Sequence, residues 1–128
     1  MKSFSFFVPG PLPGRNEQEA AARGNRYAAA SMKKAWTERV YQIIVGCLPV
    51  PKFEKVVIVL HWFEKDRRRD KDNIFGFVKY LLDGMVKAGL IENDGWKHVE
   101  NFVNIWGVNK ENPGVFVEVF EWSEWRNK

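Results

Sequence analysis

Two aspartates, Asp70 and Asp72, lie two positions apart where an apolar, strand-like run gives way to a helical pattern. In an extended backbone, residues i and i+2 point to the same side, so the two carboxylates can converge. A third aspartate, Asp94, follows the predicted helix, and the sequence leaves open whether the chain returns it to the first two. Three carboxylates that met would need a cation between them, and oxygen ligands favour Mg²⁺ or Mn²⁺.

The first two aspartates also suit a purely structural role at the start of the helix. Asp70 or Asp72 could simply cap it and interact with the positive end of its dipole. A calcium-binding loop of the EF-hand type is excluded, because that loop needs glycine at its sixth position, where this chain has Phe75.

Basic residues adjoin the carboxylates. Arg67, Arg68 and Arg69 stand between Asp66 and Asp70. Such a short charged run is often only a solvated loop. Basic donors beside clustered carboxylates are nevertheless what a phosphodiester substrate requires, because its charge must be neutralised before it is attacked.

A lysine on the predicted helix is a further candidate. Lys79 lies seven residues after Asp72, which is about 700° of helix and brings the two within roughly 20° of the same direction. Asp83 lies on the same side. The alternative is an ordinary surface ion pair between Lys79 and Asp83 at i, i+4 spacing.

The elements that must position these groups follow from the apolar patterns. Prolines and glycines punctuate the chain, and we expect an irregular loop from Gly10 to Arg26. Helices are predicted from a cap at Ser31 to Gly46 and from about Asp72 to Ala88. The predicted strands cover residues 3–8, 53–63, 99–108 and 115–121.

These elements predict an α+β fold in two layers. The expected order is βαβαββ, with a small mixed sheet of about four strands and two helices on one face. A chain of 128 residues with 45% apolar positions suits one domain, residues 1–128, with a packed core. The structure of the aromatic and acidic tail, residues 121–125, is left open.

The amino-acid composition indicates which partner and which cellular environment to expect. The net charge of +4 modestly favours an anionic partner such as nucleic acid. The single cysteine, Cys47, argues against a disulfide-stapled secreted protein and indicates a reducing, cytoplasmic environment. No apolar run approaches the roughly 18 residues of a membrane span, and the first residues do not resemble a signal peptide.

Three segments together resemble the RusA family of Holliday-junction resolvases. They are the runs Arg69 to Asn73, Lys79 to Gly84 and Lys87 to Asp94, and the opening Phe7-Val8-Pro9-Gly10-Pro11 is also similar to the family's first strand and proline-rich loop. The resemblance covers most of the chain in order. It implies a homodimeric, Mg²⁺- or Mn²⁺-dependent endonuclease, often encoded by phages or prophages, that cuts four-way DNA junctions symmetrically in recombination and repair.

The resemblance also implies roles for individual residues. The metal-binding aspartates of the family fall on Asp70, Asp72 and Asp94, the family's arginine falls on Arg69, and its asparagine falls on Asn73. The better-known members carry their helical lysine four residues after the second aspartate, where this chain has Gly76. Lys79 matches the lysine if three extra residues lie in the helix or in the loop before it.

We therefore expect a catalytic set of five residues and a separate set of DNA contacts. Arg69 and Lys79 would stabilise charge on the phosphorus, beside the three metal-binding aspartates. The expected DNA-binding residues are Arg15, Arg23, Arg26, Arg67, Arg68 and Asn73. No nucleotide cofactor is expected.

A homodimer is the expected assembly, since a symmetric junction is most simply cut by a two-fold protein. Trp96, Trp106, Trp122 and Trp125 exceed what a small core needs and hint at an interface. Two alternatives remain: a junction-binding protein that does not cleave DNA, and a small α+β scaffold protein with no role in nucleic-acid binding.

Overall fold

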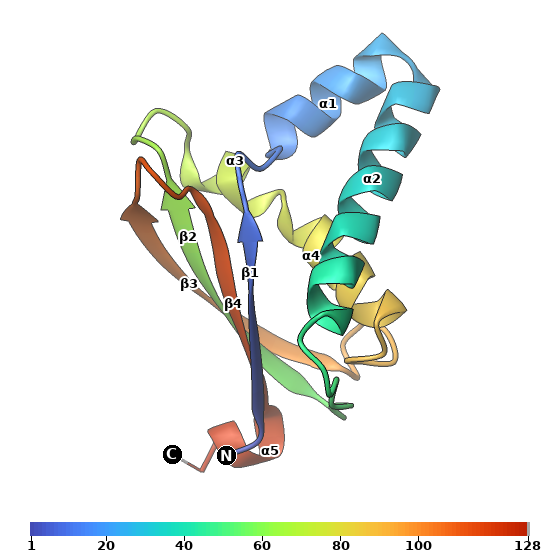
Figure 1. Cartoon of the computed structure of the whole chain (residues 1–128), viewed down its shortest axis with the longest axis vertical. Helices are drawn as coiled ribbons and strands as arrows, with labels where there is room; N and C mark the ends of the chain where they lie inside the picture. The colour runs from blue at the N-terminus through green and yellow to red at the C-terminus, as the bar shows by residue number, and fades with distance from the viewer. Residues whose placement is uncertain (128) are drawn as a thin grey trace.

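The computed structural model describes residues 1–127, whose four strands form one mixed sheet in the order β1-β4-β2-β3 (Figure 1). The strands are β1 (Ser3–Pro9), β2 (Val56–Glu64), β3 (Val99–Val108) and β4 (Gly114–Glu121). β4 runs antiparallel to both β1 and β2, whereas β2 and β3 are parallel. The predicted α+β class with a four-stranded mixed sheet is confirmed.

Two helices, α2 (Arg26–Val45) and α4 (Val78–Lys87), cover one face of this sheet (Figure 1). They correspond to the two predicted helices. Three further helices are α1 (Arg15–Gly24), α3 (Lys71–Phe75) and α5 (Trp122–Trp125). None of the helices within residues 1–127 is both long and apolar enough to cross a membrane.

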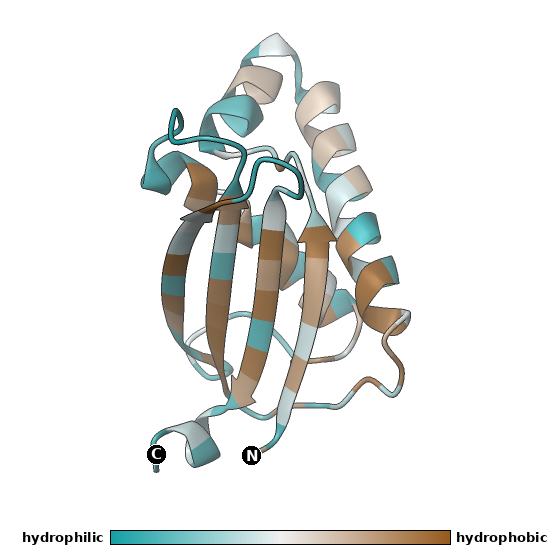
Figure 2. Ribbon diagram, turned by 60° about the vertical axis from the view of Figure 1, so that its left-hand side comes forward, coloured by the Kyte–Doolittle hydropathy of each residue, from teal (hydrophilic) through white to brown (hydrophobic). Residues whose placement is uncertain are grey.

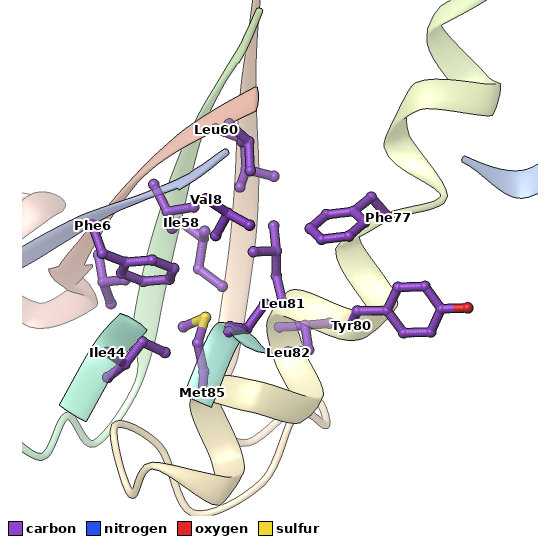
Figure 3. Close-up of a cluster of buried hydrophobic side chains, with 14 of the residues drawn as sticks. Phe6, Val8, Ile44, Ile58, Leu60, Phe77, Tyr80, Leu81, Leu82 and Met85 are labelled. Atoms are coloured by element: carbon purple, nitrogen blue, oxygen red, sulfur yellow. The ribbon is translucent and has the colours of Figure 1, made fainter. Parts of the chain in front are cut away.

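The core lies between the sheet and the two helices. Alternate residues of β2, among them Ile58 and Leu60, point towards the helices and are almost fully buried. They meet Leu81 and Met85 of α4 and Ile44 of α2, as Figure 3 shows. The strands are largely brown in Figure 2, whereas the loops at the upper end of the sheet are teal. Each such side chain contributes about 1.5–3 kcal/mol when it leaves water.

The prediction of an irregular loop from Gly10 to Arg26 is wrong, because α1 occupies ten of these seventeen residues. Glu17 reaches back to accept a hydrogen bond from the backbone N–H of Gly14 (2.9 Å), which fixes the first turn. The backbone N–H of Asn16 donates to Oδ1 of Asn73 (2.8 Å). The contact with Asn73 ties α1 to α3, which is far away in the sequence.

The start of α2 also differs from the prediction. The helix begins at Arg26, five residues before the expected cap at Ser31, and Asn25 is the N-cap residue. The side chain of Asn25 accepts a hydrogen bond from the backbone N–H of Ala28 (2.7 Å). The predicted end at Gly46 is confirmed.

The single helix predicted from about Asp72 to Ala88 is divided into α3 and α4 at Gly76 and Phe77. At this division the first residue of α1 packs directly on Gly76. A Cβ atom at Gly76 would lie only 2.6 Å from the backbone nitrogen of Arg15 and 2.8 Å from its Cβ. Glycine is therefore required here by the close approach of α1.

We predict that Gly76→Ala lowers the free energy of unfolding by about 1–3 kcal/mol, because the added methyl group forces α1 away from α3. Urea denaturation monitored by circular dichroism measures the change. The control is Gly24→Ala, where an added Cβ would meet nothing within 4 Å. That control should leave stability unchanged or slightly raised. Equal effects at the two positions would contradict the packing role of Gly76.

Candidate functional site

A cavity of about 640 Å³ lies where β2 and β3 end and α3 begins. It mixes carboxylates, basic groups and apolar surface, and it contains both members of the predicted aspartate pair. Its lining residues are Glu64, Asp66, Arg67, Arg69, Asp70, Lys71, Asp72, Ile74, Trp106, Gly107 and Val108.

Asp70 and Asp72 stand at the start of α3. Asp70 occupies the N-cap position with an extended backbone (φ −71°, ψ 152°), yet its side chain makes no capping hydrogen bond within the described chain. Asp72 lies in the first turn. Both residues line the cavity wall and keep contact with solvent, so their carboxylates remain available to a ligand.

Arg69 is the centre of an ion-pair cluster. Its guanidinium binds Glu64 in a bidentate pair, with Nε to Oε1 at 2.8 Å and Nη2 to Oε2 at 2.9 Å. Nη1 donates to the backbone carbonyl of Leu12 (2.9 Å) and to the carboxylate of Glu17. One side chain thus joins the end of β2, the proline-rich loop and α1.

These contacts determine the charge that Arg69 can offer. The hydrogen bond to Glu64 is the main reason that the pKa of Arg69 is raised above its usual value, and Glu17 adds to the effect. Two carboxylates therefore neutralise the one guanidinium. Its position makes Arg69 a residue that fixes the architecture around the cavity, with little positive charge left for a substrate phosphate.

Lys71 and Trp106 form a basic and aromatic part of the cavity wall. The Nζ atom of Lys71 lies 5.7 Å from the centroid of the Trp106 ring. Trp106 is stacked on Trp62 (6.0 Å between centroids), and Nε1 of Trp62 donates to Oδ1 of Asn104 (2.8 Å). The aromatic side of the cavity is therefore anchored in the core.

Asp94 lies at the other end of the sheet. It belongs to the exposed loop before β3, and this loop meets the start of β2 through the hydrogen bond from Val56 N–H to the His98 carbonyl (2.8 Å). Asp70 instead follows the end of β2. A strand of nine residues spans roughly 26 Å at about 3.3 Å per residue. One chain therefore does not bring Asp94 to the aspartate pair. In Figure 1 the loop that follows α4 lies at the opposite end of the sheet from α3.

The three predicted metal ligands do not meet in the single chain. Within residues 1–127, no three side chains of the metal-ligating types lie close enough together to hold an ion. The predicted set of Asp70, Asp72 and Asp94 does not fit a metal within a single chain. Only the first two share a site.

Lys79 lies outside the cavity. Its Nζ is 3.9 Å from Asp83 Oδ1, and the other oxygen of Asp83 is 3.9 Å from Nζ of Lys33 on α2. The side chain of Lys79 is 58% exposed. The structure thus places this lysine in a surface ion-pair group between α2 and α4.

The predicted DNA-binding residues fall into three places. Arg67 lines the cavity, and Arg68 beside it is exposed and 3.6 Å from Asp66. Asn73 is buried and caps α1 through the contact with Asn16. The remaining three arginines lie on α1 and at the start of α2: Arg15 by α3, and Arg23 and Arg26 at the far tip of this helical pair.

Four charged or aromatic lining residues were not among the predicted site residues: Glu64, Asp66, Lys71 and Trp106. Lys71 could have been found, since it stands between the two aspartates at the start of a helix. Trp106 and Glu64 carry no such signal, because their place depends on the parallel pairing of β2 with β3.

Comparison with known proteins adds no relative: no family model matches the chain, and no curated protein matches it.

We predict that Arg69→Met lowers the free energy of unfolding by about 1–3 kcal/mol, because Glu64 and Glu17 lose their shared partner. Thermal and urea denaturation measure the loss. Arg68→Met is the matched control, since the Arg68 side chain is 87% exposed. That control should change stability by less than about 0.5 kcal/mol. A stable Arg69→Met protein would show that the cluster does not hold the fold together.

Proposed function

We propose that the protein is a metal-dependent endodeoxyribonuclease that cuts four-way DNA junctions as a homodimer. The observation that carries the proposal is the cavity at the end of β2, where Asp70 and Asp72 lie beside Arg67 and Lys71. Carboxylates for a cation next to basic donors for phosphate are the groups that phosphodiester hydrolysis needs. The preference for a junction is supported by the resemblance of the sequence to the RusA family.

Lys71 is the best candidate for the cation that meets the scissile phosphate. Arg69 is neutralised by two carboxylates, and Lys79 lies outside the cavity. Lys71 lines the cavity between the two aspartates, and Arg67 extends the basic surface. Trp106 supplies an apolar wall on which a nucleotide base or sugar can pack.

The proposed ion is Mg²⁺ or Mn²⁺, and its ligands would come from two chains. Asp70 and Asp72 would supply carboxylates from one subunit, and the partner's Asp94 would supply the third. When bound, such an ion polarises phosphate oxygens and lowers the pKa of a bound water. The chain's own contribution is to hold Asp70 and Asp72 at the start of α3, which Asn73 and Gly76 fasten to α1.

Two-fold symmetry supplies the geometry that one chain lacks. Asp70 and Asp94 lie at opposite ends of β2 and β3. If two sheets lie antiparallel about a two-fold axis, the end of each sheet lies beside the start of the other. Both copies of Asp94 would then reach an aspartate pair, giving two equivalent sites for two strands of a junction.

A second candidate function is junction binding without cleavage. It is favoured by the separation of Asp94 from the aspartate pair in the single chain, which within residues 1–127 leaves no complete metal-ligand set. The two functions are distinguished by incubating the protein with labelled four-way junction and duplex DNA in Mg²⁺, Mn²⁺ or chelator. Cleavage of the junction that chelator abolishes supports the nuclease, and binding alone under every condition supports the alternative.

We predict that Asp70→Asn and Asp94→Asn each lower cleavage by roughly a hundredfold or more, and that a mixture of the two regains activity. In a mixed dimer with sites shared between subunits, one site lacks both carboxylates and the other keeps both. After random exchange of subunits, about a quarter of the wild-type nicking rate should return. Nicking of a labelled junction measures it.

The mixing experiment has two kinds of control. Each variant mixed with itself should stay inactive, and Asp83→Asn, a carboxylate outside the cavity, should cut at the wild-type rate. Sites contained within one chain would leave every mixture inactive, and that result would contradict the shared site.

We also predict that Lys71→Ala lowers the cleavage rate by roughly a hundredfold, the scale of losing one preorganised donor. Lys79→Ala should leave cleavage unchanged and alter stability by less than about 0.5 kcal/mol. Single-turnover cleavage of the junction measures the rates, and denaturation measures the stabilities. A reversed pattern, with Lys79 essential and Lys71 dispensable, would overturn the assignment.

A further inference from the structure

The two carboxylates that bind Arg69 differ in how firmly the fold holds them. Glu64 ends β2, its side chain is 16% exposed, and it accepts from both Nε and Nη2 of the guanidinium. Glu17 stands on α1, its side chain is 43% exposed, and it accepts only from Nη1. Ion pairs with exposed carboxylates contribute little stability. Glu17 is therefore the partner that another anion can replace.

The second carboxylate also gives this cluster an excess of negative charge. One guanidinium and two carboxylates sum to −1, whereas Arg69 and Glu64 alone sum to zero. The cluster adjoins the cavity that Asp70 and Asp72 line, so its surroundings are already acidic. Replacing Glu17 by an external anion moves one carboxylate from this acidic region into water, where its charge is screened.

Arg69 and Glu64 line two neighbouring cavities. One is the cavity with the aspartate pair, and the second has a volume of about 450 Å³. Glu17 and the exposed Lys65 line only the second cavity, whose remaining lining is largely apolar and includes Trp36. Because the two cavities share these residues, one DNA strand that crosses them can place a phosphate in each.

The helix that carries Glu17 contributes no buried side chain to the core. The backbone N–H of Asn16 donates to Asn73, and Nε2 of Gln18 donates to the Gly76 carbonyl (2.9 Å). In Figure 1, α1 lies beyond the tip of β1, outside the layer that α2 and α4 form on the sheet. Segments without buried apolar contacts open at low free energy, so Glu17 can leave Arg69 while the core stays folded.

We infer that Glu17 occupies a phosphate-binding position on Arg69, from which a backbone phosphate of DNA displaces it. The phosphate then accepts from Nη1 of Arg69 and from Lys65 in the second cavity, while Glu64 keeps Nε and Nη2. A phosphate accepts from a guanidinium in the same geometry as a carboxylate does. The field of the DNA backbone attracts both cations and repels Glu17. The inference rests on the proposed function, because it adds a second phosphate contact on the same substrate.

Binding of a labelled four-way junction in chelator tests the displacement without cleavage. Glu17→Gln removes the charge and keeps the size of the side chain, so the junction should bind roughly fivefold more tightly. Glu19→Gln is the matched control on the same helix, because Glu19 pairs with Arg15 instead of Arg69. That control should change the affinity by less than about twofold. Equal effects of the two variants would overturn the inference.

The gain from Glu17→Gln should also depend on Arg69. Arg69→Lys keeps a positive charge beside Glu64 but loses the planar fork, so it cannot serve Glu64 and a phosphate together. In this background, Glu17→Gln should change the junction affinity by less than about twofold. A gain that persists would come from the general loss of negative charge and would overturn the displacement. Melting temperatures of the variants check that each one is folded.

Lys65 provides a test that leaves the ion-pair cluster intact. A lysine that meets a phosphate adds about one unit to the slope of log affinity against log salt concentration, so Lys65→Ala should reduce that slope by about 1. Lys52→Ala, which removes an exposed lysine before the start of β2, is the matched control and should leave the slope unchanged. An unchanged slope in Lys65→Ala would overturn the proposed phosphate position.

The same variants separate this inference from the proposed function. A protein that binds junctions with these dependences but cuts none in Mg²⁺ or Mn²⁺ would support the phosphate position and overturn the nuclease. A protein that cuts junctions, and in which Glu17→Gln and Glu19→Gln have equal effects on binding, would support the nuclease and overturn the displacement.

Discussion

The parallel pairing of β2 and β3 is the constraint on which the candidate site depends. Parallel neighbours require the chain to cross from one end of the sheet to the other, and here α3 and α4 form that crossover. Asp70 and Asp72 stand where the crossover begins, and Asp94 stands where it ends. The acidic groups are therefore separated by the length of a strand, whatever the local conformation of their loops.

The sequence predicts those elements whose stability comes from their own pattern. β2 is a run of β-branched residues buried on both faces, and α4 has an apolar stripe of helical period, so both are recognisable locally. α1 is different, because none of its residues, Arg15–Gly24, is buried. Its helix is stabilised by Asn73 and Gly76, almost sixty residues away, and no local pattern reports such contacts.

The residues of the candidate site likewise fall into those that the local sequence predicts and those that it does not. Asp70, Asp72 and Arg67 could be predicted together because they are neighbours in sequence and remain neighbours in the cavity. The full neutralisation of Arg69 could not, since Glu64 supplies only one of the two carboxylates and Glu17 from α1 supplies the other. The location of Asp94 depends on the direction of β3 relative to β2, which short-range spacing does not encode. Composition and spacing thus identify the groups, and the strand directions decide which of them meet.

The separation of the acids along one sheet bears directly on the proposed dimer. A two-fold axis uses the same surface on both subunits, so a contact between the end of one sheet and the start of the other occurs twice. A crossover that places the acids at opposite ends of one sheet is no obstacle to a shared site in such a pair. In the proposed dimer, antiparallel alignment of the two sheets would turn the separation within each chain into proximity between chains.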